Sequence, residues 1–248
     1  MGDVYRKGPV ELRLGDYREV LADVEPDAVI ADCPYSPRVH SGQRTGTETA
    51  KATIEYEPLS PEWCGRFADF WDERSRWWVL TFSDHLGATW WEAAHEARGR
   101  YVFAPVIYWR KNATPRVCGD GPTSAVDYIT VSRPRRRTPA GMTGSRPGLY
   151  GAMQGGWNVT IPGGKDVNAM RSIVRDYSLP GGLVCDPTAG GATTLIAAAL
   201  EGRRAIGAEL DPETYRKACA RIERTALTPP LPGLDCGRTD GKQEGLDL

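Results

Sequence analysis

Two short motifs in the sequence place acidic residues next to an aromatic residue or a run of glycines, each directly after an apolar run. The first runs from Asp32 through Cys33 and Pro34 to Tyr35, directly after the apolar run Ala28–Ala31. An acidic side chain followed by a rigid turn and an aromatic ring offers an acceptor for an amino group and a face on which a planar base can stack. Taken alone, the motif is also compatible with a turn in which Asp and Pro have only structural roles.

The second motif is rich in glycine and follows an apolar run that ends at Cys185. It reads Asp186-Pro187-Thr188-Ala189-Gly190-Gly191-Ala192-Thr193-Thr194, and Glu209 ends the next apolar run. Glycines allow a backbone to approach a ligand closely, and a carboxylate roughly twenty residues further on can accept hydrogen bonds from both ribose hydroxyls. The pattern predicts a nucleoside-binding turn, with a tight turn needed only for packing as the alternative.

Cysteine, histidine and overall charge indicate other chemistries only weakly. The six cysteines are widely separated without a C-x-x-C pair, and the three histidines lie at 40, 85 and 95. We therefore expect no metal site and no disulfide framework. A net charge of -1, from 31 basic and 32 acidic residues, excludes a global cationic field for nucleic acid, so any such surface must be local.

Alternating strand and helix patterns surround both motifs. Strands are expected at 12–14, 28–32, 77–82, 101–109, 125–131, 183–185 and 205–209, and helices at 17–21, 61–71, 88–97, 166–177, 193–200 and 212–225. The first and last pairs of strands read as βαβ units, which predicts an α/β domain with a mostly parallel sheet. Because ligands of such sheets bind at the carboxyl ends of the strands, both motifs lie where a site is expected.

Three segments lack this periodicity. Residues 38–60 are predicted to form a mobile loop beside the active site, residues 112–160 are the least regular part of the body, and the tail 226–248 is expected to be disordered. The apolar runs are far shorter than the roughly 20 residues that span a bilayer, so no membrane association is expected. The polar start of the chain shows no secretion signal, which favours a cytoplasmic location.

Together the two motifs resemble those of the DNA amino-methyltransferases, which methylate adenine N6 or cytosine N4. In that family the catalytic motif is D/N/S-P-P-Y/F/W, and the cofactor motif is close to D-P-F-x-G-x-G-T-T. Here Cys33 stands in place of a proline of the first, while Thr188 and Ala192 replace the phenylalanine and the second glycine of the other. The catalytic motif comes first, as in the permuted β-class subgroup, and the resemblance covers about residues 10–225.

The resemblance implies a Rossmann-like, S-adenosylmethionine-dependent methyltransferase fold in a catalytic domain over residues 1–225. It implies S-adenosylmethionine as the cofactor, lying against Asp186 and Gly190, with Glu209 on the ribose hydroxyls. Further cofactor contacts implied by the matching positions are Asp16, Lys165, Pro187 and Thr193. Lys165 matches by position only, since the lysine of the subgroup precedes a proline and this one precedes an aspartate.

In the resembled enzymes the catalytic motif acts on the exocyclic amine of a flipped base. Asp32 and the main-chain carbonyl of Cys33 would accept hydrogen bonds from that amine, Pro34 would hold the turn, and Tyr35 would stack on the base. Such catalysis needs neither a covalent intermediate nor a metal, so the Cys33 thiol is not expected to be a nucleophile. The initial Asp, rather than Ser, favours adenine N6. Cytosine N4 and a catalytically degenerate DNA-binding protein are the alternatives.

The expected partner is double-stranded DNA, and residues 112–160 would form the target-recognition region. Between 110 and 146 there are eight basic residues and two acidic ones, an excess that suits phosphate contacts, although a solvated basic loop is the alternative. A recognition region this small suggests help from a homodimer, and a restriction endonuclease partner is compatible with the resemblance. The candidate DNA contacts are Arg116, Arg133, Arg135, Arg136 and Arg137.

Overall fold

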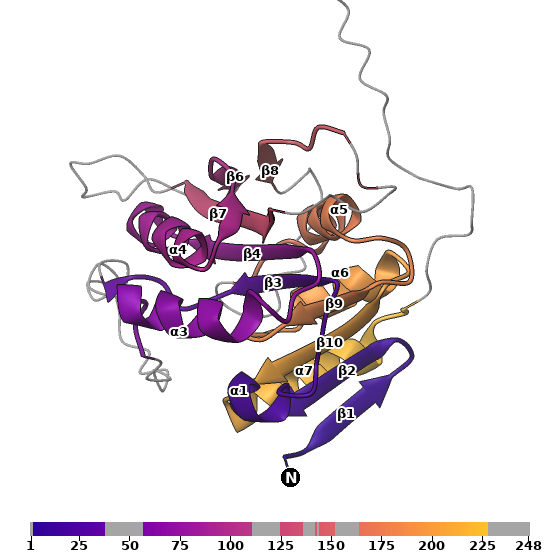
Figure 1. Cartoon of the computed structure of the whole chain (residues 1–248). Helices are drawn as coiled ribbons and strands as arrows, with labels where there is room; N and C mark the ends of the chain where they lie inside the picture. The colour runs from indigo at the N-terminus through magenta and orange to yellow at the C-terminus, as the bar shows by residue number, and fades with distance from the viewer. Residues whose placement is uncertain are drawn as a thin grey trace, which may run out of the picture.

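One mixed sheet forms the centre of the computed structural model, which describes residues 2–37, 57–110, 125–135, 142, 144–151 and 164–227. Ten strands make up the sheet in the order β1-β2-β10-β9-β3-β4-β7-β6-β8, with β5 also paired to β7 (Figure 1). The strands are β1 (Val4–Lys7), β2 (Val10–Leu14), β3 (Ala28–Asp32), β4 (Trp78–Ser83), β5 (Arg100–Val102), β6 (Val106–Trp109), β7 (Val126–Pro134), β8 (Leu149–Gly151), β9 (Leu183–Asp186) and β10 (Arg204–Glu209).

The middle of the sheet is parallel, as predicted. Strands β2, β10, β9, β3 and β4 run in one direction, whereas β1 and β7 are antiparallel to their neighbours β2 and β4. The predicted βαβ unit β9–β10 is confirmed. The other predicted βαβ unit, β2–β3, was wrong in one respect. Its two strands are parallel, but they are not neighbours, because β10 and β9 lie between them. An apolar pattern indicates that a strand is buried and does not say which strands flank it.

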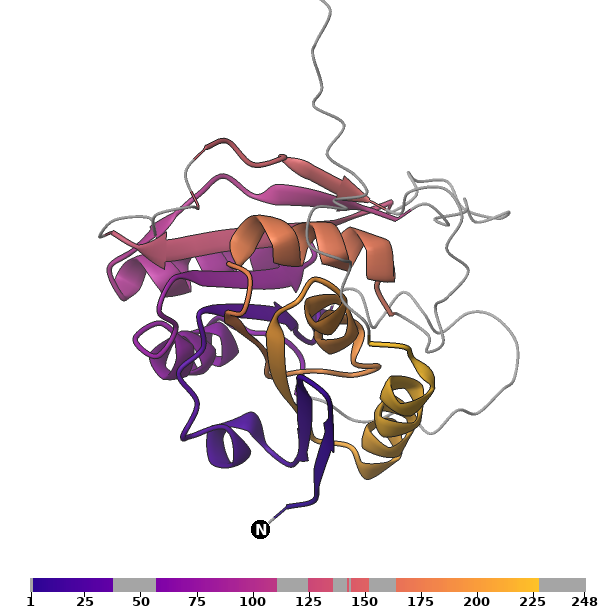
Figure 2. The same ribbon diagram turned by 90° about the vertical axis from the view of Figure 1, so that its right-hand side faces the viewer.

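Helices cover both faces of the sheet. Helices α1 (Tyr17–Val20), α3 (Pro61–Trp71) and α4 (His85–Ala97) lie on one face, and α5 (Val167–Tyr177), α6 (Thr193–Leu200) and α7 (Pro212–Arg224) lie on the other (Figure 2). Because side chains alternate along a strand, Val29 and Ala31 of β3 pack with the aromatic side chains of α3 and α4, while Ala28 and Ile30 pack with α5 and α6. The strand that carries the catalytic motif is thus buried on both faces.

Side-chain caps define where the helices begin. The hydroxyl of Ser60 accepts a hydrogen bond from the amide of Trp63 at 3.1 Å, which confirms the predicted start of α3. Asp84 accepts one from the amide of Gly87 at 2.8 Å, so α4 begins three residues earlier than predicted. Asp166 likewise caps α5 through the amide of Ala169, at 2.9 Å.

The region between α4 and α5 differs most from the prediction. The single strand expected over 101–109 is two strands, β5 and β6, separated around Pro105, which lacks the amide hydrogen that a continuous ladder needs. Strand β7 extends to Pro134, three residues further than predicted, and its Ile129 and Val131 are buried in the core. Strands β1 and β8 were not predicted. Within the described residues, no helix is long and apolar enough to cross a membrane.

Several predictions concern residues that this structure does not describe. Residues 38–56 of the expected active-site loop, and 228–248 of the expected disordered tail, lie outside the described residues. The interval 112–160 is described only at 125–135, 142 and 144–151, and its first described part is β7, a strand of the central sheet. Because β7 belongs to the central sheet, target recognition remains a prediction for the other residues of the interval 112–160.

Candidate active site

Asp32 lies at the carboxyl end of β3 and forms an ion pair with Lys165. The ammonium Nζ of Lys165 is 2.8 and 2.7 Å from the two carboxylate oxygens of Asp32 and 3.0 Å from the hydroxyl of Tyr35. The Asp32 side chain is 29% exposed and that of Lys165 only 8%, so the lysine approaches from the interior. Lys165, expected among the cofactor contacts, therefore lies against the catalytic motif.

The turn after β3 is held at several points. The hydroxyl of Tyr35 lies 3.4 Å from Asp32 Oδ1. The main-chain carbonyl of Tyr35 accepts a hydrogen bond from the amide of Leu59 at 3.2 Å. The next hydroxyl, that of Ser36, donates to Asp84, the residue that caps α4. Burial, and then the charge of Asp32, raise the pKa of Tyr35 well above its usual value, so the phenol stays protonated.

The thiol of Cys33 lies in the core, away from the expected base. Cys33 is 3% exposed and belongs to the hydrophobic cluster that includes Cys64 of α3. Burial raises the pKa of the thiol well above its usual value, and neighbouring acidic groups, among them Asp32 and Asp186, act in the same direction. A protonated, buried thiol is not a nucleophile, which agrees with the sequence interpretation.

The glycine-rich turn connects β9 to α6 and is tied to Glu209 at the end of β10. The carboxylate of Glu209 accepts hydrogen bonds from the amides of Gly190 and Asp211, both at 2.9 Å. Gly190 has a φ of +50°, and a Cβ added there would have no neighbour nearer than 3.9 Å, so the space beside the turn is open. Ala192 also adopts a left-handed conformation, with a φ of 60°. The turn thus keeps the shape that a glycine-rich motif requires.

Asp186 is a buried carboxyl group beside this turn. It is 2% exposed, and its Oδ1 accepts a hydrogen bond from the amide of Thr188 at 3.1 Å. Burial raises the pKa of Asp186 to about 7, the charges of Asp32 and Glu209 add to the rise, and hydrogen bonds from Thr194 and Thr188 oppose it. A cationic ligand placed beside Asp186 would therefore favour its ionised form.

Asp16 and Glu209 come together where β2 and β10 end. Asp16 caps α1 and pairs with Arg18, whose hydrogen bonds lower the pKa of the Asp16 carboxyl. The amide of the preceding residue, Gly15, donates to the carbonyl of Glu209 at 2.9 Å. The expected nucleoside contacts Asp16, Asp186 and Glu209 therefore follow three strands of the parallel part of the sheet.

The sequence reasoning did not predict a contact made by Arg221 of α7, which donates hydrogen bonds to the same turn. Its guanidinium donates to the carbonyl of Gly191 at 2.6 Å and to the hydroxyl of Thr193 at 2.8 Å. Thr193, expected to contact the cofactor, is thus already engaged, and Pro187 is buried. Arg221 lies in a segment that matches the resembled family, but the sequence did not predict its contact with the turn, because its partners lie about 30 positions earlier.

The two motifs meet because β3 and β9 are neighbours. The strands pair in parallel, with Ala28 opposite Val184 and Val29 opposite Cys185. Asp32 and Asp186 therefore end adjacent strands at the same edge of the sheet, and the charge of Asp32 contributes to the raised pKa of Asp186. The arrangement brings the carboxylate of Asp32 next to the glycine-rich turn.

A second acidic residue, Asp127 of β7, lies behind Lys165 and was also missed. Its Oδ2 is 3.5 Å from Lys165 Nζ, its Oδ1 is 3.4 Å from Nε of Arg110, and its side chain is 3% exposed. The Lys165 ammonium also lies 5.0 Å from the ring centroid of Phe82 and 5.7 Å from that of Tyr108. A single acidic residue in an apolar strand gives no sequence signal for such a role.

The candidate DNA contacts are not gathered at this site in the described structure. Arg116, Arg136 and Arg137 lie outside the described residues. Arg133 and Arg135 follow Ser132, which pairs with Val79 near the start of β4, so they lie at the opposite edge of the sheet from Asp32. There the Arg133 guanidinium lies over the ring of Tyr101, and Arg135 donates to the carbonyl of Gly99 at 3.1 Å.

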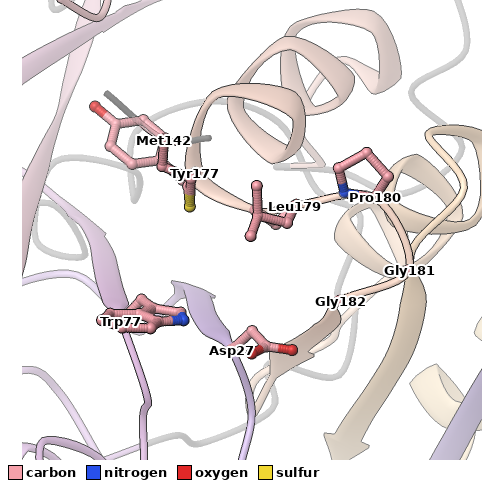
Figure 3. A pocket seen from close by; sticks show the side chains of 9 residues that line it. Asp27, Trp77, Met142, Tyr177, Leu179, Pro180, Gly181 and Gly182 are labelled. Atoms are coloured by element: carbon pink, nitrogen blue, oxygen red, sulfur yellow. The ribbon is translucent and has the colours of Figure 1, made fainter. Parts of the chain in front are cut away.

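A cavity of about 230 Å³ also lies at that opposite edge. Figure 3 shows Asp27, Trp77, Tyr177 and Gly182 among its lining residues, which adjoin the ends of β3, β4, α5 and β9 farthest from the catalytic motif. The cavity is therefore separate from the site at Asp32. Among the residues that the structure describes, no group of three or more His, Cys, Asp or Glu side chains could hold a metal ion.

Comparison with known proteins identifies a matching family. A family model for N6/N4 methyltransferases, described as DNA methylase, matches residues 27–220, which include both motifs. A comparison with curated proteins finds no match.

Solved structures with a similar fold agree with the family match. The M1.HpyAVI complex with SAM has a TM-score of 0.62 at 18% identity, and the match covers 86% of this chain and 98% of that one. TTHA0409 from Thermus thermophilus, complexed with S-adenosyl-L-methionine, has a TM-score of 0.59 at 21% identity, covering 89% and 95%. The cytosine-N4-specific PvuII DNA methyltransferase has a TM-score of 0.62 at 14% identity, covering 90% of each chain. These similarities establish the fold.

Proposed function

Because this chain belongs to the N6/N4 DNA methylase family, we propose that it transfers a methyl group from S-adenosylmethionine to the exocyclic amine of a flipped base in double-stranded DNA. Adenine N6 is the target that we place first. The proposal is carried by the position of Asp32, which ends β3 beside β9 and thus brings an amine acceptor next to the nucleoside-binding turn.

The residues of the turn fit S-adenosylmethionine. Its ribose carries two hydroxyl donors, and Glu209 is a carboxylate at the end of the strand next to β9. Asp186, with a pKa of about 7, becomes a stronger acceptor when a cationic molecule lies beside it. The open space at Gly190 lets a nucleoside approach the backbone. When bound, S-adenosylmethionine supplies a methyl group activated by its sulfonium.

The protein must make a poor nucleophile react. The lone pair of an aromatic amine is delocalised into the ring, and acceptors on its two protons favour the pyramidal form whose lone pair is free to attack. We assign the acceptor roles to Asp32 and the carbonyl of Cys33, and the stacking that aligns the base to Tyr35. Bound S-adenosylmethionine would supply the methyl group to the nitrogen, and Asp32 or water would accept the proton that the methylated amine loses.

Asp at the first position of the motif supports adenine as the target, whereas cytosine N4 would use the same geometry. A catalytically degenerate protein is disfavoured by the shape of the turn. Ala192 stands where the family motif has a glycine, and its backbone is left-handed, a conformation that glycine adopts readily. The carbonyl of Cys33 is likewise present without the proline of the motif.

The test is mass spectrometry of nucleosides from unmethylated duplex DNA that has been incubated with the purified protein and S-adenosylmethionine. N6-methyladenine is the expected product. N4-methylcytosine would keep the mechanism and reverse the choice of base. If S-adenosylmethionine binds but neither product appears on DNA of varied sequence, the chain is a degenerate family member, and transfer to RNA alone would refute the proposal.

The broader expectations remain proposals. We propose that residues 1–225 form the catalytic domain and that the segments around β7 within 112–160 contact the target sequence. Light scattering with and without DNA would test for the homodimer. A cytoplasmic location and an endonuclease partner need a cellular experiment, such as co-purification from the native host.

A further inference from the structure

Lys165 occupies the acceptors that the target amine needs. Both carboxylate oxygens of Asp32 lie within 2.8 Å of its ammonium. Each oxygen has a second lone pair, so an amine could still approach from the exposed side of Asp32. However, a cation at this distance neutralises the carboxylate, and a neutralised carboxylate is a weak acceptor for a neutral amine. The reaction would therefore be favoured if Lys165 withdrew.

Asp127 is a second position for the same ammonium. A movement of under 1 Å would bring Nζ within hydrogen-bond distance of Asp127 Oδ2, now 3.5 Å away. The lysine stem is flexible enough for this movement, and the rings of Phe82 and Tyr108 beside the ammonium stabilise a cation along the way. Burial raises the pKa of Asp127, with Lys165 and then Arg110 opposing the rise, so Asp127 gains from a closer cation.

Arg110 explains why Lys165 prefers Asp32 before the base arrives. Its guanidinium lies 3.4 Å from Asp127 and partly neutralises that carboxylate, whereas Lys165 is the cation that faces Asp32. Charges of alternating sign therefore run from Asp32 through Lys165 and Asp127 to Arg110. When a base amine donates to Asp32, the carboxylate needs Lys165 less, and the balance moves toward Asp127.

We infer that Lys165 is a positioning residue that shifts from Asp32 in the free protein to Asp127 when the target amine binds, and that Asp127 is needed to receive it. The inference rests on the proposed function. It assigns a role to Asp127, which lies about 95 residues from the catalytic motif in sequence and contacts that motif through Lys165 and the hydroxyl of Tyr35.

The test compares methyl transfer by the full-length wild type with that by D127N, K165M and the double variant K165M/D127N. In D127N, Lys165 no longer has a second carboxylate to which it can move. The value of kcat should therefore fall by about tenfold to a hundredfold, which corresponds to the free energy of one charge-assisted hydrogen bond. The dissociation constant of S-adenosylmethionine should not change. In the double variant no ammonium blocks Asp32, so kcat should recover to that of K165M, above that of D127N.

The recovery distinguishes a moving lysine from a static support of Asp32. A double variant as slow as D127N, or slower, would overturn the inference while leaving the proposed function in place. If the wild type itself transfers no methyl group, the proposed function fails first and the inference fails with it. D176N is the matched control, because Asp176 accepts a hydrogen bond from Tyr150 at 2.6 Å elsewhere on α5, and it should leave kcat unchanged. Thermal unfolding of each variant verifies that it folds.

Discussion

The buried carboxyl of Asp186 should make the free protein less stable as the pH rises. A pKa of about 7 in the folded state, against 3.8 ordinarily, means that the folded chain binds more protons than the unfolded chain between these pH values. The free energy of unfolding therefore falls as the pH rises through this window. At 1.36 kcal/mol per pH unit, the full effect is about 4 kcal/mol above pH 7.

The substitution Asp186→Asn removes the titration and keeps the shape. The amide oxygen can still accept from the amide of Thr188, and the amide nitrogen can donate to the hydroxyl of Thr194. Relative to wild type, D186N should therefore gain stability toward alkaline pH, and the gain should grow by about 3 kcal/mol between pH 5 and pH 8. The same variant should bind S-adenosylmethionine more weakly, because it has lost the carboxylate that a cation favours.

Urea unfolding of the ligand-free protein, followed by the fluorescence of its eight tryptophans, measures this difference at each pH. D3N is the control, because it removes one exposed carboxylate and changes the net charge as D186N does without touching the buried site. Stability curves of D186N and wild type that stay parallel from pH 5 to pH 8 would refute the reasoning, because they would show that burial does not hold a proton on Asp186.

Three further predictions concern the turn and the motif. E209Q should weaken S-adenosylmethionine binding at least tenfold in calorimetry, which is about the free energy of one charge-assisted hydrogen bond. E213Q, at the exposed start of α7, should bind S-adenosylmethionine as the wild type does. Equal affinities of E209Q and E213Q would show that Glu209 does not bind the ribose. C33A should retain methyl transfer and lose about 1 kcal/mol of stability in urea, and an inactive but folded C33A would contradict a bystander thiol. In G207A the new Cβ would meet the carbonyl of Asp186 at 2.8 Å, so unfolding measurements should show a loss of about 1–3 kcal/mol, and a neutral effect would show that β10 can move aside.

The sequence predicted the parts of the site that depend on local patterns. Asp32, Asp186 and Glu209 each end an apolar run, and the carboxyl ends of parallel strands form one edge of the sheet, so their proximity follows from the fold class. The start of α3 was predictable for the same reason, because its cap, Ser60, lies beside the helix that it starts.

The parts that were missed depend on contacts between distant segments. Lys165 meets Asp32 across 133 positions, and Asp127 becomes significant only because β7 pairs with β4 and brings it behind that lysine. Arg133 and Arg135 show the converse. Their positive charge was visible in the sequence. Because β7 runs antiparallel to β4, however, both arginines lie at the end of the strands opposite to Asp32, and the composition of a strand does not tell in which direction it runs.

The order of strands also has a consequence for how this chain folds during synthesis. Strands β9 and β10, from residues 183–209, lie between β2 and β3, which come from the first 32 residues. Until residues 183–209 have left the ribosome, β2 and β3 lack the partners that will lie between them, and the edges of these two strands are open to other chains. The central sheet therefore closes late, through pairings of high sequence separation, which makes folding slow and a chaperone useful to the nascent protein.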